Sequence, residues 1–302
     1  MRVLITGASG LLGAAVADAL LARGDEVVGL SRDPEKARPG NPTVNWHRWD
    51  PATERPPPEA LAGVDAVVNL IGEEINQRLT EEAKRRLRES RISSTRNLLQ
   101  GIAAAEQKPK VFVGQAAVGY YGDRGAQILD EESEPGGDWI ARLVVDWEAA
   151  EHEAEGLGMR TVILRSAPVL TKHGGLLKQL ALPFKLGLGG PIAGGDQYLP
   201  WIHLDDEVGL VLWALDEEKV SGTIAATSPT PVTNREFSKA LGGALNRPAL
   251  LPVPKFAVAA MRGRELADAV AGGQRVLPRR ATDLGYEFRH PELDGALEAA
   301  LR

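Results

Sequence analysis

The chain contains no cysteine, and this absence excludes disulfide bonds, thiolate nucleophiles and cysteine-based metal sites. Histidine is also scarce. The five histidines are scattered along the sequence without the spacing of a metal-ligand motif, so we expect no bound metal.

Long apolar runs and clusters of basic residues are missing as well. No segment is long and apolar enough to span a bilayer, and no basic stretch followed by an apolar run precedes the first strand, so we expect a cytoplasmic protein without a membrane partner. The net charge is −6, and no run of lysine and arginine could follow a phosphate backbone. Nucleic acid is therefore not an expected partner.

The composition, with 43% hydrophobic and 25% charged residues among 302, is that of a globular protein. Up to about residue 165, short apolar runs alternate with helical stretches, which is typical of a parallel sheet covered by helices. The predicted strands span Arg2–Thr6, Glu26–Leu30, Val44–Trp49, Ala66–Ile71, Val111–Gly114 and Thr161–Arg165. The predicted helices span Leu11–Arg23, Thr80–Glu106 and Asp138–Glu155. We therefore predict the α/β class, with a Rossmann-type, doubly wound parallel sheet.

The pattern changes after Leu170. Glycine and proline crowd residues 183–195, and the predicted elements become shorter. A capping box formed by Thr233 and Glu236 begins one helix of this region. We predict a core domain over residues 1–170 and a smaller C-terminal α/β lobe over residues 171–302. This lobe is expected to close over the core as a substrate or lid lobe, and it can return a strand to the core sheet.

The first strand runs directly into a glycine-rich turn, Thr6-Gly-Ala-Ser-Gly-Leu-Leu-Gly13, which opens an amphipathic helix. Gly7 permits the tight turn, Gly10 lets the backbone approach a pyrophosphate, and Gly13 lets the helix pack on the sheet. The helix N-terminus adds free N–H groups and a positive end. In this context the pattern predicts a dinucleotide site rather than a merely tight turn. The loop residues assigned to the cofactor are Gly7, Ser9, Gly10, Leu11, Leu12 and Gly13.

The second predicted strand ends in Ser31 and Arg32, at the place where an NAD site carries an acidic side chain for the ribose 2′-hydroxyl. A guanidinium there can pair with the 2′-phosphate of NADP(H) and stack on the adenine. Asp33 comes later and is expected to turn into the loop. We predict NADP(H) as the cofactor. The alternative is that Arg32 is a solvated loop residue and that either cofactor binds.

Arg91 falls in line with the apolar stripe of the predicted helix 80–106. An arginine on a buried face needs an anionic partner, and the sequence leaves open whether this is a cofactor phosphate or a carboxylate of the core. The cofactor set also includes residues where the fourth and fifth strands end, at the edge that binds ligands in such sheets. They are Leu70, Ile71, Gly72, Gln115 and Ala116.

Several short sequence motifs beyond the glycine loop are typical of one protein family. They are Asp65–Glu73, Tyr120–Asp123, Asp146–Glu148, Pro183–Gly190, Trp201–Asp206 and Gln274–Pro278. With the Gly-x-x-Gly-x-x-Gly loop they make the chain resemble, over essentially its whole length, an extended short-chain dehydrogenase/reductase. The resemblance is to the NAD(P)-dependent epimerase/dehydratase type and, within it, to the atypical YfcH-like group. It implies a Rossmann fold and NADP(H), and it implies little about the reaction.

Active members of the superfamily that the chain resembles transfer protons with a Tyr-x-x-x-Lys pair on a helix and a Ser or Thr from the fifth strand. Aligning Ala150-Glu151 with the usual Ala-Glu of that helix places Leu143 at the Tyr position and Trp147 at the Lys position. Ala117 falls at the Ser/Thr position. The predicted helix 138–155 contains neither Tyr nor Lys, so we expect the usual proton relay to be missing.

Tyr121 and His203 remain as candidates for proton transfer, and we expect them to face a common cleft near the nicotinamide. The alternatives are a core or rim tyrosine and a buried, hydrogen-bonded structural histidine. The sequence favours an oxidoreductase or epimerase-like enzyme for an unidentified small carbonyl or sugar-type molecule. A catalytically silent NADP(H)-binding protein that senses redox state is the alternative. The sequence also leaves open whether the protein forms a homodimer.

Overall fold

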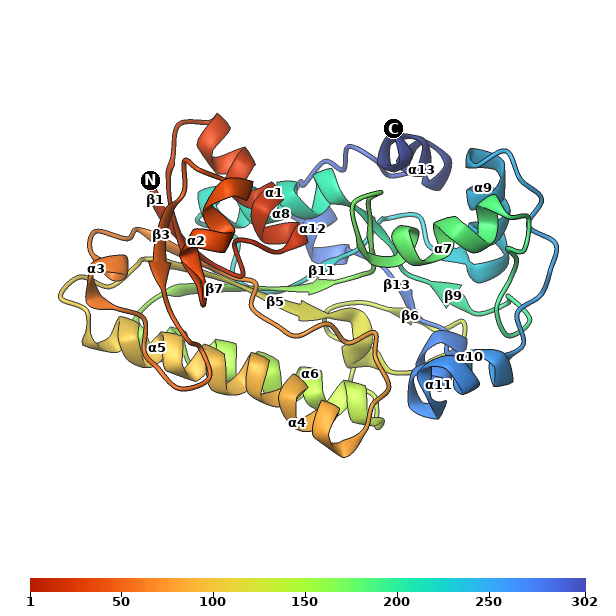
Figure 1. Ribbon diagram of the computed structural model, residues 1–302, viewed down its shortest axis with the longest axis horizontal. Helices are drawn as coiled ribbons and strands as arrows, with labels where there is room; N and C mark the ends of the chain where they lie inside the picture. Colours follow the sequence, from red (N-terminus) through yellow and green to blue (C-terminus); the bar gives the residue numbers. More distant parts are fainter.

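A seven-stranded parallel sheet forms the centre of the computed structural model, which describes all residues from 1 to 302 (Figure 1). The strand order is β11-β7-β5-β4-β1-β2-β3. These strands are β1 (Arg2–Thr6), β2 (Glu26–Ser31), β3 (Asn45–Arg48), β4 (Ala66–Asn69), β5 (Val111–Ala117), β7 (Arg160–Ser166) and β11 (Gly222–Ala226). The central position of β1, with the chain winding outward to both sides, confirms the predicted Rossmann-type fold.

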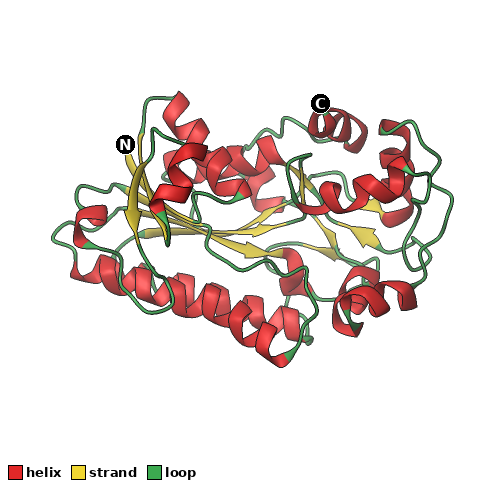
Figure 2. Cartoon of the chain, in the orientation of Figure 1, coloured by secondary structure: helices red, strands yellow, loops and turns green.

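Helices cover both faces of the sheet, as Figures 1 and 2 show. On one face lie α1 (Leu11–Ala22) and α8 (Leu204–Asp216), which pack on each other. On the other face lie α4 (Glu81–Arg88), α5 (Ser94–Ala104) and α6 (Trp139–His152). Each face encloses its own apolar core, because alternate side chains of a strand point to opposite faces. On β1, for example, Val3 and Ile5 belong to one core and Leu4 to the other.

The predicted helix 80–106 is interrupted at its middle. Between α4 and α5 the chain makes a π-helical turn, Glu89–Ser93, and the side chain of Ser94, the first residue of α5, donates a hydrogen bond to the carbonyl of Glu89. The predicted fourth strand is shorter than expected, because Leu70 and the residues after it leave the sheet and line a cavity. Both departures occur beside that cavity, and π turns are frequent at functional sites.

The C-terminal part consists of shorter elements, some of which enclose a separate core. Its helices are α7 (Gly175–Lys185), α9 (Asn234–Ala244), α10 (Lys255–Arg262), α11 (Arg264–Ala271), α12 (Arg279–Asp283) and α13 (Leu293–Leu301). Three two-stranded ladders join β8 (Val169–Leu170) to β10 (Ile202–His203), β9 (Tyr198–Leu199) to β12 (Val232–Thr233), and β6 (Ile128–Leu129) to β13 (Arg275–Val276). The capping box of Thr233 and Glu236 is present at the start of α9, which confirms that prediction.

Residues beyond 170 also build the central sheet, since β11 pairs in parallel with β7 over five residues. The strand β11 and the helix α8 therefore belong to the core although they follow residue 170 in the sequence, and α8 packs beside α1. None of the helices combines the length and the apolar character needed to cross a membrane.

Candidate functional site

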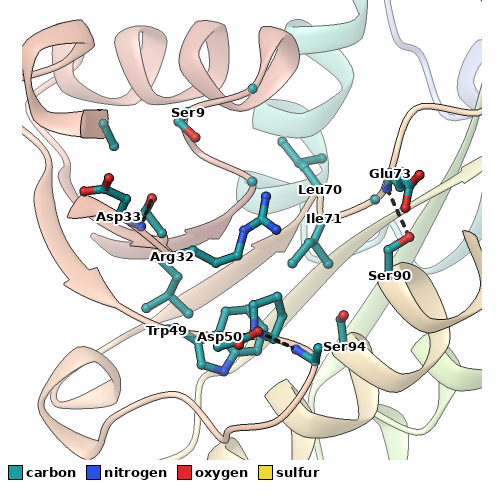
Figure 3. A pocket seen from close by; sticks show the side chains of 18 of the residues that line it. Ser9, Arg32, Asp33, Trp49, Asp50, Leu70, Ile71, Glu73, Ser90 and Ser94 are labelled. Atoms are coloured by element: carbon teal, nitrogen blue, oxygen red, sulfur yellow. Dashed lines mark hydrogen bonds between the residues drawn. The ribbon is translucent and has the colours of Figure 1, made fainter. Parts of the chain in front are cut away.

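A cavity of about 1000 Å³ opens at the carboxyl edge of the sheet (Figure 3). Its walls come from the turn after β1, the segments after β2, β3 and β4, and the π turn with the start of α5. Ligands of open α/β sheets bind at this edge, beside the strand where the winding direction reverses. Of the predicted cofactor residues, the cavity is lined by Gly7, Ser9, Gly10, Ser31, Arg32, Leu70, Ile71 and Gly72.

The glycine turn is shaped by close backbone contacts. Gly7 has a φ of +66°, and a Cβ atom there would lie 2.7 Å from the carbonyl oxygen of Leu70. A Cβ atom on Gly13 would collide with the backbone of Gly7, so only glycine lets α1 start this close to the turn. Leu11, Leu12 and Gly13 form the first turn of α1 behind the cavity wall and do not line it.

The N-terminus of α1 leaves its first N–H groups free for an anion. Gly10 is the N-cap residue and has no side chain that could cap the helix, and the first turn carries no acidic residue. Helix N-termini left in this state bind phosphate groups, because the unpaired N–H groups and the helix dipole both favour negative charge.

The segment after β2 contributes two cations, Arg32 and Lys36, to the cavity wall. The side chain of Arg32 extends into the cavity between Ser9 and Trp49 and forms no ion pair (Figure 3). Lys36 lines the same wall, and the sequence prediction missed it. Asp33 also lines the cavity, but its Oδ1 atom accepts a hydrogen bond from the backbone N–H of Lys36 at 3.2 Å and so caps the short helix α2 (Pro34–Ala37). The wall therefore carries two positive charges against one carboxylate that is occupied as a helix cap.

The opposite wall of the cavity also escaped the sequence prediction. It is formed after β3 by Trp49, Asp50, Pro51 and Ala52. The indole N–H of Trp49 donates to the carbonyl of Glu54 at 2.8 Å, and the carboxylate of Asp50 accepts the N–H of Ala52 at 3.1 Å. These contacts hold the segment against the cavity. The only sequence signal for this wall is that the third predicted strand ends at the same edge of the sheet as the first two.

Arg91 is buried, as predicted, but its hydrogen bonds go to two backbone carbonyls and to the hydroxyl of Ser90, and none goes to a carboxylate. Its guanidinium donates to the carbonyl of Glu73 at 2.8 Å and to that of Leu87 at 3.3 Å, and it lies 4.9 Å from the ring centre of Trp147. Burial lowers the pKa of Arg91 to about 10, while the nearby charge of Glu73 acts in the opposite direction. Arg91 does not line the cavity. It fixes the segment after β4 that does.

A buried polar network lies beneath the cavity. The hydroxyl of Thr6 donates to Asn69 at 2.7 Å and accepts the backbone N–H of Leu70 at 3.1 Å. The amide of Asn69 donates to Thr95 at 3.0 Å and to Glu151 at 3.1 Å. Burial raises the pKa of Glu151 well above its usual range and thereby favours the protonated form of this carboxyl. The network ties the ends of β1 and β4 together and thereby sets the width of the cavity floor.

A second buried carboxyl, that of Glu207 on α8, lies beside residues of β5 and β7. The hydroxyl of Ser166, at the end of β7, donates to the carboxyl of Glu207 on α8 and lies 3.4 Å from the side-chain amide of Gln115 on β5. Glu207 is fully buried, and burial raises its pKa to about 7. Neither Gln115 nor Ala116, both predicted cofactor residues, lines the large cavity.

Replacing Glu207 by glutamine is expected to change how stability depends on pH. The pKa of Glu207 is raised from 4.5 to about 7, so the folded protein keeps a proton that the unfolded chain releases between these values. The free energy of unfolding of the wild type therefore falls as pH rises through this window, by roughly 3 kcal/mol at most. Glu207→Gln stays neutral and should escape this loss. Urea unfolding at pH 5 and pH 8 measures the effect, and equal pH dependence in both proteins would contradict the assignment.

Tyr121 and His203 lie in different surroundings. The hydroxyl of Tyr121 is buried and accepts a hydrogen bond from Arg165 at 3.3 Å, and burial raises its pKa to about 12. His203 is buried at the start of α8, where burial and the neighbouring His290 lower its pKa. Neither residue lines the large cavity. Their assignment to proton transfer stays a prediction.

A second cavity, of about 520 Å³, lies between the core and the C-terminal part. Its core side is formed by the turn after β5 and the start of α6, and its other side by α10 and α11. The polar residues of its lining are Asp123, Asp138, Arg142, Lys255, Glu265, Asp268 and Gln274. The second cavity thus combines charges of both signs with one side-chain amide, that of Gln274.

Comparison with known proteins places this chain among others of the same architecture. Residues 3–225 match the model of the "NAD dependent epimerase/dehydratase family", and residues 253–300 match a "domain of unknown function (DUF1731)". The human "epimerase family protein SDR39U1" is 40% identical over 303 residues, which cover 99% of both chains.

Two crystal structures resemble this one over its whole length. The structure of human SDR39U1 (isoform 2) with NADPH has a TM-score of 0.88 and 37% identity and covers 99% of both chains. The structure of a nucleoside-diphosphate sugar epimerase from Corynebacterium glutamicum has a TM-score of 0.81 and 31% identity, and it covers 100% of this chain and 58% of that one.

Proposed function

The chain belongs to the NAD dependent epimerase/dehydratase family, and from this premise we propose that it binds NADP(H) and acts as an oxidoreductase or epimerase-like enzyme on a carbonyl or sugar-type molecule. Membership of the family confirms the resemblance indicated by the glycine loop and the motif phrases. The observation that carries the proposal is the pair of cations, Arg32 and Lys36, on the wall of a cavity that also contains a free helix N-terminus.

The residues of the large cavity fit a phosphorylated dinucleotide. The N–H groups at the start of α1 would hold the pyrophosphate, for which Gly7 and Gly10 leave room. Arg32 and Lys36 would hold the 2′-phosphate, with Ser31 as a further hydrogen-bonding group. The crystal structure of the human relative with NADPH supports this choice of cofactor. When bound, the cofactor supplies or accepts a hydride at its nicotinamide ring.

Arg32→Ala should weaken NADPH binding by about 1.5–3 kcal/mol and leave NADH binding almost unchanged, because only NADPH carries the 2′-phosphate. Arg38→Ala is a matched control. It removes the same charge from a neighbouring turn, outside the cavity lining. Fluorescence titration with both cofactors measures the effect. If Arg32→Ala weakens both cofactors equally, Arg32 supports the loop and does not read the phosphate.

The second cavity is the proposed substrate site. It follows β5 along the same carboxyl edge that holds the large cavity, and its far wall belongs to the C-terminal part. Its polar lining matches a hydroxylated substrate, in keeping with the sugar-nucleotide chemistry named for the relative from C. glutamicum. Lys255 and Asp268 form an ion pair of 2.7 Å in this cavity, which a polar substrate could open or bridge.

A catalytically silent NADP(H)-binding protein is the second candidate function, and one observation favours it. Leu143 and Trp147, at the positions of the usual Tyr and Lys, are buried in an apolar cluster that α6 forms with α4 and the π turn. Neither side chain can act as a general base. Proton transfer would then require another group, either Tyr121 or His203 as the sequence predicts or the buried carboxyl of Glu207.

Turnover distinguishes the two candidates. The enzyme would consume NADPH in the presence of an accepted carbonyl compound, or convert an accepted sugar nucleotide into its epimer without net consumption. Absorbance of NADPH follows the first reaction, and NMR of the sugar follows the second. A panel of both substrate classes, offered to protein shown to bind NADPH, gives the answer. NADPH binding without turnover on either panel would leave the silent role as the function.

A further inference from the structure

Three potential metal ligands meet outside both cavities. The imidazole of His203 and the carboxylate of Asp205 come from the start of α8, and the imidazole of His290 comes from the segment before α13. The Oδ2 atom of Asp205 lies 3.1 Å from Nε2 of His290 and 3.6 Å from Nδ1 of His203. One ligand atom from each of the three residues lies within 4.8 Å of the other two.

We propose that His203, Asp205 and His290 bind a divalent transition-metal ion, with Zn²⁺ as the ion of best fit. Two imidazoles and one carboxylate are a ligand set that Zn²⁺ prefers, and three protein ligands leave a fourth tetrahedral position for water or another ligand. Bonds of about 2.0–2.2 Å would bring the ligand atoms to roughly 3–3.5 Å from one another. The imidazole rings of His203 and His290 stack with their centres 3.9 Å apart, and side-chain rotations would have to turn their nitrogen atoms towards the ion.

The backbone around the three ligands is held in place without a metal. The carboxylate of Asp206 accepts the backbone N–H groups of Arg289 at 2.6 Å and of His290 at 3.0 Å. The hydroxyl of Tyr286 donates to the carbonyl of Asp206 at 3.1 Å. The segment that carries His290 is thus fixed to the helix that carries Asp205. A metal would bind to a prepared arrangement and would not have to order a loop.

The third ligand, His203, would bind the metal through Nδ1, which lies 3.6 Å from Oδ2 of Asp205, in place of the hydrogen bond that this nitrogen accepts. Only 5% of this residue is exposed, and its Nε2 atom is buried without a hydrogen-bond partner. Its Nδ1 atom accepts the backbone N–H of Asp205 at 3.1 Å. The other two ligands are accessible to an ion from solution, since the side chains of Asp205 and His290 are 51% and 21% exposed.

Cobalt and zinc titrations test the site. In protein without a histidine tag, stripped of metal by a chelator, one equivalent of Co²⁺ should produce the visible absorption of a tetrahedral site, and Zn²⁺ should displace it. His290→Gln and Asp205→Asn should each weaken Zn²⁺ binding, measured by calorimetry, at least about tenfold. Zinc should also raise the melting temperature of the wild type and not that of His290→Gln.

His152→Gln is the matched control. His152 also lies beside a carboxylate, with Nδ1 2.7 Å from Glu155, but it has no third ligand, so its loss should leave Zn²⁺ affinity unchanged. Circular dichroism and NADPH titration establish that each variant is folded. The proposal is overturned if the wild type binds no Co²⁺ or Zn²⁺, or if binding survives in both His290→Gln and Asp205→Asn.

Discussion

Gly10→Asp is expected to abolish NADPH binding while the protein stays folded. Gly10 has a φ of −79°, which any residue adopts, and its Cβ atom would lie 3.1 Å from the carbonyl of Gly7, a contact that small shifts relieve. Aspartate is a favourable N-cap residue, so its carboxylate would bond the free N–H groups of α1. It would thereby occupy the place of the pyrophosphate and repel it. We expect a loss of at least about 3 kcal/mol, or more than a hundredfold in Kd.

Gly10→Ala separates the charge from the size of the new side chain. It adds the same Cβ atom without a carboxylate, and so should weaken NADPH binding much less than Gly10→Asp. Fluorescence titration measures the affinity, and urea unfolding establishes that both variants fold. Unchanged NADPH affinity in folded Gly10→Asp would show that the turn after β1 does not bind the phosphates.

Glu148→Gln should cause the largest loss of stability, about 3–5 kcal/mol in the free energy of unfolding. Glu148 on α6 and Arg165 on β7 are only 6% and 4% exposed, and they form two parallel hydrogen bonds of 2.7 and 2.8 Å. The variant keeps the shape of the side chain but leaves the guanidinium buried without its counter-charge. Urea unfolding near neutral pH measures the loss.

Arg96→Gln is the control for this ion pair. Arg96 and Glu153 lie 2.8 Å apart with side chains 51% and 45% exposed, and such exposed pairs contribute at most about 1 kcal/mol. A loss from Glu148→Gln as small as that of the control would contradict the expectation. The ring of Tyr120, 3.4 Å from the guanidinium of Arg165, and the carbonyl of Glu131 would then be sufficient to stabilise the buried charge.

Local patterns predicted most of the fold. The strand Arg2–Thr6 and the helix that follows Gly10 were predicted closely, because a short apolar run, helical hydrophobic spacing and glycine positions act within a few residues. The π turn was not predicted. The apolar spacing of the helix continues through it from Leu87 to Leu98, so the sequence pattern does not register the extra residue.

The site was predicted only where a motif is local. The glycine turn and Arg32 follow directly from strand ends, whereas Lys36 and Asp50 enter the cavity from segments without a motif of their own. Pairs such as Ser166 with Glu207 join residues that are far apart in the sequence. Only the packing of α8 on the sheet brings them together, and no spacing rule encodes it.

The place of β11 at the edge of the sheet has a consequence for synthesis of the chain. β7 ends at Ser166, but its partner β11 is complete only at Ala226. At ribosomal speeds of about 5–20 residues per second, the β7 edge of a nascent chain stays unpaired for roughly 3–12 s. An open strand edge beside an apolar core readily pairs with other chains. Chaperone binding during this interval would therefore protect the yield of protein more than its final stability.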